Sequence, residues 1–382
     1  FCVTKYSFSI GGHGVSVNYL YVLFPVIFYW KLRTRIMLSL EYKLLFFVMI
    51  LVFLFGIFSD FMGEFRSDRR IASFLIFTSI FTFIFANINQ LDIKLFKISI
   101  VLASVFYAFL TLHSWFEIGS SMNISSGKSA LGSQRYGFIL IFAFWILIYS
   151  PNDISKYSLV RLFLLFLVVL SIFLTFSRTT YFSLIGTGII ALIEHLISKK
   201  NSLFYSLKFY SFILCLFLIS FLIYKIPIIN SFIHSRIFDE IFVYNTILSN
   251  IETTNDSAGH RLYVWKHTLI NLSQHPLIGS SFLGCWSIEN LSFAGSYHSQ
   301  YVDNLSRLGI VGFLFFYFLI FKLMIHLFNH HKSLFYGALS CLGYGLFHET
   351  FKLSHGSFCF AFLIGIHISS FNKRSMSFCH SS

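Results

Sequence analysis

Arg178 stands in a short polar break, residues 175–180, between two long apolar segments of the sequence. A serine or threonine in that break can cap the helix that follows, and a guanidinium beside the free N–H groups of a helix N-terminus makes an anion site. The same arginine could instead extend its charge to lipid head groups. Position alone leaves both interpretations open, and it makes Arg178 a candidate site residue because arginines at membrane depth are usually functional.

Arg261 and His298 lie in a longer polar stretch further along the chain. Arg261 stands at the start of a predicted short amphipathic helix, and His298 comes just before the next apolar segment. A neutral histidine, with an unperturbed pKa of about 6.5, can take a proton from a hydroxyl. A solvated or purely structural imidazole is the alternative interpretation for a single histidine in a loop.

The spacing of ligand-type residues gives no support to metal chemistry. The six cysteines show neither a CxxC pair nor a metal-type spacing, and no histidine and carboxylate cluster has the spacing of a metal site. The pair His348-Glu349, at the end of an apolar segment, could support a neighbouring catalytic group or simply cap that segment. We therefore expect no metal and no cofactor.

The elements that carry these residues are expected to lie in a membrane. Of the 382 residues 56% are hydrophobic and 11% are charged, and the mean hydropathy is +0.76. An average soluble domain has about a quarter charged residues, so this composition excludes a water-soluble globular protein. Eleven segments approach the length of roughly 20 apolar residues that spans a bilayer. They lie near 14–30, 44–59, 71–87, 98–113, 136–150, 159–176, 179–198, 209–226, 308–328, 333–350 and 354–371.

The charged residues give these segments an orientation. The chain has 28 Lys and Arg against 15 Asp and Glu, a formal net charge of +13. Most of this excess lies on alternate connectors, which include Lys97, Arg161 and Lys332, whereas the other side is nearly balanced. By the positive-inside rule the basic side is cytoplasmic. The net charge therefore reports orientation, and we expect no nucleic-acid partner.

The predicted fold is an all-α polytopic membrane protein with about 11–12 transmembrane helices and one large periplasmic loop. Residues 1–224 hold eight helices, 225–307 form the loop, and 308–382 hold three helices and a short cytoplasmic tail. With eleven spans and a cytoplasmic C-terminus, Phe1 lies outside, and a further span upstream would return the N-terminus to the cytoplasm. A loop this long is more often functional than idle, so site residues are expected there.

At these sites the chain resembles the O-antigen ligase and O-antigen polymerase superfamily of bacterial surface polysaccharide assembly. The similar motifs cover about residues 160–325, and elsewhere the likeness is one of hydropathy alone. They are Ser177-Arg178, Arg261 four residues before Trp265, His275-Pro276-Leu277-Ile278-Gly279, His298 with Leu305, and Gly309-Ile310-Val311-Gly312. Departures from the family pattern are Ser299 after the histidine, Ser281, and Arg307 or Leu308 where an acidic residue is common.

The resemblance implies a metal-independent, inverting glycosyl transfer on the periplasmic face of the bacterial inner membrane. The donor would be an undecaprenyl-diphosphate-linked oligosaccharide. Arg178 and Arg261 would bind the diphosphate, whose negative charge grows as the sugar C1–O bond breaks. His298 would act as the base that activates the acceptor hydroxyl.

Three functions compete within this interpretation. An O-antigen polymerase is favoured, because very Phe-rich and weakly matching chains resemble the serotype-specific polymerases, and a chain-length regulator protein would then be a partner beside membrane lipid. An O-antigen ligase would pass the polymer to lipid A-core instead. A lipid-linked oligosaccharide flippase is the alternative from another class, although transporters usually carry broken helices and ionisable residues at the membrane midplane.

Overall fold

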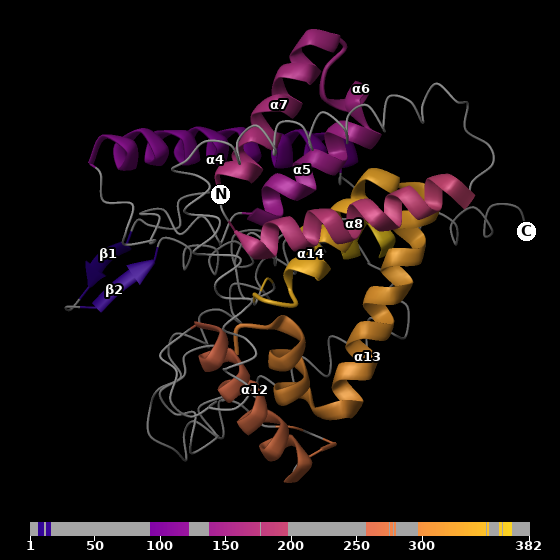
Figure 1. Ribbon diagram of the computed structural model, residues 1–382. Helices are drawn as coiled ribbons and strands as arrows, with labels where there is room; N and C mark the ends of the chain where they lie inside the picture. Colours follow the sequence, from indigo (N-terminus) through magenta and orange to yellow (C-terminus); the bar gives the residue numbers. More distant parts are fainter. Residues whose placement is uncertain are drawn as a thin grey trace, which may run out of the picture.

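The structure is a computed structural model, in which most of the described residues are helical (Figure 1). It describes residues 7–10, 13–16, 92–121, 137–175, 177–197, 257–274, 276–277, 279, 297–348, 350, 359–360 and 362–368. The spans predicted near 44–59, 71–87 and 209–226 lie outside the described residues, as does 17–30 of the first predicted span.

A two-stranded hairpin departs from the all-helical prediction. Strand β1, Ser7–Ile10, pairs antiparallel with β2, His13–Ser16, and Ile10 lies opposite His13. The sequence between the strands is Gly-Gly, a dipeptide favoured in two-residue hairpin connections. The first predicted span, 14–30, therefore does not begin as a helix at its first three residues.

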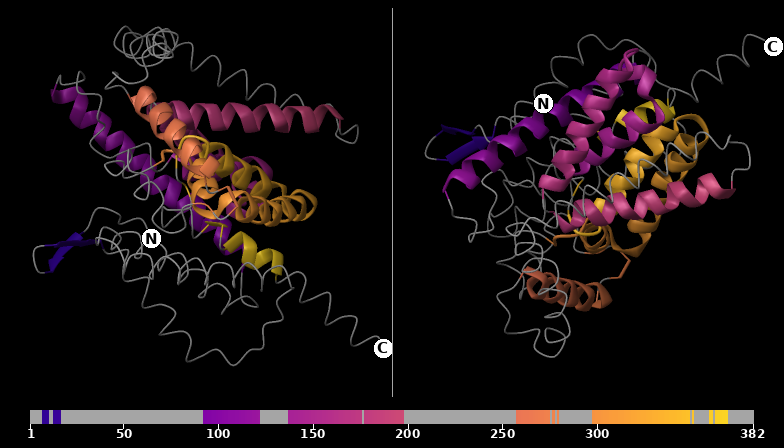
Figure 2. Two further views of the ribbon diagram at one scale, coloured as in Figure 1. Left: turned by 90° about the horizontal axis from the view of Figure 1, so that it is seen from below. Right: turned by 45° about the horizontal axis from the view of Figure 1, so that its top comes forward.

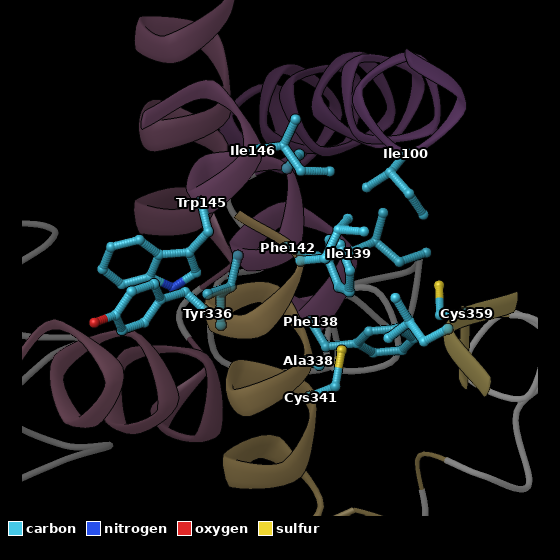
Figure 3. Close-up of a cluster of buried hydrophobic side chains, with 14 of the residues drawn as sticks. Ile100, Phe138, Ile139, Phe142, Trp145, Ile146, Tyr336, Ala338, Cys341 and Cys359 are labelled. Carbon is cyan, nitrogen blue, oxygen red and sulfur yellow. The ribbon is translucent and has the colours of Figure 1, made fainter. Parts of the chain in front are cut away.

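The centre of the molecule is helix α5, Gly137–Tyr149, whose side chains are apolar on every side. All but its last two residues are buried, as expected of a helix without a polar face. Around it pack α4 (Ile93–Ser121), α7 (Ser158–Leu174), α8 (Arg178–Ile197) and α14 (Lys332–Tyr344). Figure 3 shows the cluster that joins Phe142 and Trp145 of α5 to Tyr336 and Ala338 of α14.

Helices α5 and α14 can approach closely because Gly337 has no side chain. A Cβ atom added to Gly337 would lie 2.6 Å from the Phe142 ring, so glycine allows the two helices to meet at that level. The Trp145 indole N–H then donates to the Ser340 hydroxyl at 2.9 Å, which satisfies a buried polar group.

Three of the described helices are long and apolar enough to cross a membrane: Ile93–His113, Thr179–Ile197 and Gln300–His330. The helices α5 and α7 are apolar but shorter. Large apolar side chains such as Leu102, Phe163 and Phe321 are mostly exposed on the outer surfaces of their helices. Lipid tails would cover such surfaces in a membrane.

Helix α13, Gln300–His330, begins eight residues before the predicted span and bends at Gly309, where φ is +64°. Because of the bend, the N–H of Ile310 donates to the carbonyl of Pro276 at 2.8 Å instead of to a carbonyl of its own helix. Gly279, with φ +71°, packs so tightly that an added Cβ would lie 2.6 Å from the amide nitrogen of Gly309. Pro276 and Gly279 thus support the bend of α13.

The helix bundle has two ends of different composition. The Tyr344 end contains the first residues of α5, α8 and α13 and the last residue of α14. The Glu194 end contains Lys97, the short helix α6 (Pro151–Ile154), Glu194 and Lys332. Helix α12, Ser257–Gln274, packs beside the first turns of α13, as Figures 1 and 2 show.

Candidate functional site

The first turn of α8 carries the Ser177-Arg178 motif. Helix α8 begins at Arg178, and the buried Ser177 caps it, because its hydroxyl accepts from the Thr180 N–H at 3.4 Å and its carbonyl from the Tyr181 N–H at 3.1 Å. The backbone thus puts Arg178 at a helix N-terminus, where free N–H groups favour an anion. The Arg178 side chain lies outside the part of the chain that the structure describes.

Tyr344 lies beside the first turn of α8. It is the last residue of α14, and its side chain is wholly buried. A Cβ atom added to Gly137 would lie 3.1 Å from Tyr344 Cε2 and would collide with the Thr180 hydroxyl in the first turn of α8. Arg261, half-buried on α12, lies near enough for its positive charge to act on the Tyr344 side chain.

His298 lies on a strained backbone between two buried residues. Its φ is +55°, and among the described residues it is the non-glycine residue with a positive φ. Its side chain is half-buried. Such a conformation costs a histidine roughly 1–3 kcal/mol and persists only where the surrounding structure imposes it, and residues of this kind cluster at functional sites. Its neighbours Tyr297 and Ser299 provide that constraint.

Tyr297 anchors the His298 segment to α12 and α13. The Trp265 indole N–H of α12 donates to the Tyr297 carbonyl at 2.9 Å, and the Tyr297 hydroxyl bonds to the Ser306 hydroxyl at 2.8 Å. Arg261 precedes Trp265 by four residues, about one helical turn or 6 Å along the axis. The helix that carries Arg261 is therefore tied directly to the residue before His298.

Ser299 and Gln300 anchor the same segment to α14. The Ser299 hydroxyl caps α13 by accepting from the Val302 N–H at 3.5 Å, and the Gln300 N–H donates to the Gly345 carbonyl at 2.8 Å. Gly345 directly follows Tyr344. The structure thus places His298 where α12, α13 and α14 join, and the elements that carry all three predicted site residues lie at the Tyr344 end.

Sequence reasoning did not find Tyr344. The available signal was a tyrosine four residues before His348 near the end of an apolar segment, a spacing that puts two rings on one helix face. In the structure these rings stack, with centroids 4.9 Å apart and planes at 22°. His348, for which the sequence allowed either a supporting or a capping role, therefore lies against Tyr344.

Sequence reasoning also missed an ion pair close to the bend of α13. The Arg307 Nε donates to Asp303 Oδ1 at 2.8 Å, one helical turn away, and both side chains are largely buried. Arg307 is one of the positions where the sequence departs from the family pattern. Its partner lies within its own helix, so the pair stiffens the first turns of α13 ahead of Gly309.

Groups suited to metal binding are not seen in the described ranges: no three His, Cys, Asp or Glu residues there are positioned to hold an ion. The site as described offers guanidinium groups, a helix N-terminus, a histidine and several hydroxyls. These groups can bind an oxyanion and accept a proton from a hydroxyl.

Comparison with known families supports the motif resemblance. Residues 163–317 match the O-antigen ligase family model. This O-antigen ligase segment covers less than half of the 382-residue chain and contains Arg178, Arg261 and His298. No curated protein matches the chain. The predicted resemblance to the O-antigen ligase and polymerase superfamily is thus confirmed over that segment, and together with the apolar helices it indicates an integral membrane protein.

Members of the O-antigen ligase family are glycosyltransferase-like enzymes. The O-antigen ligase segment begins within α7 and ends within α13, so it includes α8 and α12. Tyr344 and the carbonyl of Gly345 lie beyond it. The contacts that bring the segment's motifs together are therefore supplied in part by a helix outside the matched residues.

Proposed function

We propose that this protein is an O-antigen polymerase, which joins undecaprenyl-diphosphate-linked oligosaccharide repeats on the periplasmic face of the bacterial inner membrane. The observation that carries the proposal is the gathering of the first turn of α8, the Arg261-bearing helix α12 and the His298 segment around the end of α14. An anion site and a base in one place suit a transfer that expels a diphosphate.

Arg178 and Arg261 stabilise the leaving group. As the bond between the sugar C1 and the diphosphate oxygen breaks, its electron pair passes to that oxygen, and negative charge spreads over the diphosphate. Guanidinium groups form bidentate, charge-assisted hydrogen bonds with phosphate oxygens. Donors that are in place before the charge develops lower the barrier, because they need no reorganisation during the reaction.

His298 activates the acceptor. Its neutral imidazole takes the proton of the acceptor hydroxyl as the oxygen attacks the sugar C1 from the side opposite the diphosphate. Attack in line with the leaving group inverts the anomeric configuration. The junction of Tyr297, Ser299 and Gln300 fixes the backbone of His298, so the imidazole reaches the acceptor from a constant position.

The sidedness of the proposal has support in the charged residues. Lys97, Asp153, Glu194 and Lys332 come from connectors whose charge predicts one side of the membrane, and they form ion pairs at the Glu194 end. The Tyr344 end is then the periplasmic end by the positive-inside rule. The partners would be the lipid-linked donor and acceptor, membrane lipid and a chain-length regulator protein.

An O-antigen ligase is the second candidate, favoured by the description of the family that matches residues 163–317. It would use the same donor and the same three residues but a lipid A-core acceptor. A flippase for the same lipid-linked sugar would need no glycosyl transfer at all.

A deletion strain and a purified protein together test the proposal. Loss of a polymerase leaves lipopolysaccharide with a single repeat, whereas loss of a ligase leaves bare core and accumulated lipid-linked polymer. Purified protein in liposomes should elongate lipid-linked repeats without a nucleotide or an ion gradient. A protein that moves the lipid across the bilayer and forms no glycosidic bond would overturn the assignment.

A further inference from the structure

The peptide group between Tyr297 and His298 is held by a side chain of another helix. The Trp265 indole N–H of α12 donates to the Tyr297 carbonyl at 2.9 Å. That carbonyl lies in the plane of the peptide bond that enters His298, because a peptide group is rigid and planar. The φ angle of His298 is the rotation of this plane about the bond from the His298 nitrogen to its Cα. A contact on the carbonyl therefore acts directly on φ.

The φ angle held in this way is an unusual one. It is +55°, a value that a histidine adopts only where the surrounding structure imposes it. On the other side of His298 the chain is fixed as well, because the Gln300 N–H donates to the Gly345 carbonyl of the segment that follows α14, at 2.8 Å. With the chain held there, the orientation of the entering peptide group depends on Trp265.

The Tyr297 side chain keeps the same peptide group in place. It is wholly buried, it packs against the buried Val264 of α12, and its hydroxyl bonds to the Ser306 hydroxyl of α13 at 2.8 Å. Val264 directly precedes Trp265. Two neighbouring residues of α12 thus hold the ring and the carbonyl of one tyrosine, next to the strained histidine.

We propose that Trp265 is a positioning residue, whose indole N–H holds His298 in the strained backbone conformation from which its imidazole reaches the acceptor hydroxyl. The inference rests on the function proposed above. Trp265 acts through His298, since its indole N–H is engaged by the Tyr297 carbonyl. Without this hydrogen bond the peptide group rotates, and His298 relaxes toward the negative φ that most residues adopt. Its imidazole then moves away from the acceptor.

Helix α12 thereby carries two functions on one face. Residues four apart lie on the same side of a helix, so Arg261 and Trp265 project from α12 in similar directions. One would bind the diphosphate, and the other would hold the base. The two roles are separable, because Arg261 keeps its place on α12 when the indole N–H of Trp265 is removed.

The test compares Trp265→Phe with Trp145→Phe in the purified full-length protein. Both changes keep an aromatic ring and remove an indole N–H, but that of Trp145 donates to the Ser340 hydroxyl in the helix core. For Trp265→Phe we expect kcat to fall about 10- to 100-fold, as for a misplaced catalytic group. KM for the acceptor and inhibition by undecaprenyl diphosphate should stay within about twofold of wild type. Trp145→Phe should change none of the three, and equal losses in both variants would overturn the inference.

Trp265→His is the conservative variant. Its imidazole is a five-membered ring that, in the neutral form with the proton on Nε2, has an N–H as many bonds from the backbone as the indole N–H. It should recover most of the kcat that Trp265→Phe loses, and it serves in its place if Trp265→Phe does not fold. Thermal unfolding in detergent checks each variant. A folded Trp265→His with no more activity than Trp265→Phe, or with none, would assign the effect to packing of the indole and contradict the inference.

A His298→Asn background shows whether Trp265 acts through the base. The imidazole is absent there, so addition of Trp265→Phe should lower the residual transfer by less than about twofold. A further fall of about 10- to 100-fold, as large as in the wild-type background, would give Trp265 a role independent of His298 and exclude the positioning role.

His298→Asn also separates this inference from the proposed function. An inactive His298→Asn beside a fully active Trp265→Phe would overturn the positioning role alone. A fully active His298→Asn would overturn the proposed base as well.

Discussion

The two ends of the helix bundle hold their helices together by different means. At the Glu194 end, charged partners from separate helices meet: Lys97 Nζ bonds to Asp153 Oδ2 at 2.7 Å, and Lys332 bonds to Glu194. At the Tyr344 end, helices are joined by tyrosine and serine hydroxyls, an indole N–H and backbone carbonyls. The ion pair described there, between Asp303 and Arg307, lies within one helix.

A continuous polar network connects the helices at the Glu194 end. Lys97 also donates to the Ser150 hydroxyl at 2.9 Å, which bonds to Ser333 at 2.8 Å, next to Lys332. Each of these basic residues is matched by a carboxylate, as expected of groups that fix helix positions at a membrane surface. The Tyr344 end shows instead a bent helix and a strained histidine, and backbone strain of this kind accompanies functional sites.

Of all the changes considered, substitution of His298 should lower transfer activity the most. His298→Asn keeps a residue that tolerates a positive φ, but it removes the base. We expect transfer to fall about 100- to 10,000-fold, the range associated with general base catalysis. Elongation of lipid-linked repeats by purified protein measures the loss, and thermal unfolding in detergent checks that the variant is folded. A folded and fully active variant would contradict the role of His298.

Loss of either proposed diphosphate ligand should have the next largest effect. Arg178→Ala and Arg261→Ala should each lower transfer about 100- to 1,000-fold, as removal of one oxyanion donor does. The matched control is Arg161→Ala, since Arg161 lies at the other end and donates to Asn152. The same assay should show wild-type polymer length and amount for the control. Comparable losses at Arg161 would remove the distinction between the ends.

The ion pairs of the Glu194 end should matter for stability and not for chemistry. Asp153→Asn leaves the buried Lys97 without its carboxylate, which should cost about 1–3 kcal/mol of unfolding free energy. The activity per folded molecule should stay within about twofold of wild type. Denaturant unfolding and transfer assays on the same preparation separate the two quantities. An activity loss on the scale of the arginine variants would show that both ends serve the reaction.

His331, also at the Glu194 end, should give the smallest effect, a dependence of stability on pH. Burial lowers the pKa of His331 from its ordinary value of 6.5, and the charges of Lys97 and His330 lower it further. The unfolded chain then takes up a proton that the folded protein resists, so stability falls as pH drops below about 6.5. His331→Asn should flatten this part of the profile in thermal unfolding from pH 5 to 8. An unchanged profile would assign the dependence to other groups.

Much of the helical framework could be predicted from hydropathy. Predicted spans at 136–150, 159–176 and 179–198 coincide closely with α5, α7 and α8, and the span at 98–113 lies within the longer α4, because an apolar run of sufficient length has few other stable states in a membrane. Helix α13 begins eight residues before the span predicted at 308–328. Its first turns are polar, and packing against Pro276 and Gly279 supports them, which hydropathy does not register.

The sequence by itself determined the membrane class, the charge asymmetry and the choice of Arg178, Arg261 and His298, because each depends on residue type and local spacing. Only the tertiary structure decided that the first turn of α8 lies beside Tyr344 and that His298 adopts a positive φ. These features arise from contacts between residues far apart in the chain. Local patterns do not specify which helix ends lie together, since the close packing of Gly137 and of the Phe138 ring against Tyr344 makes that choice.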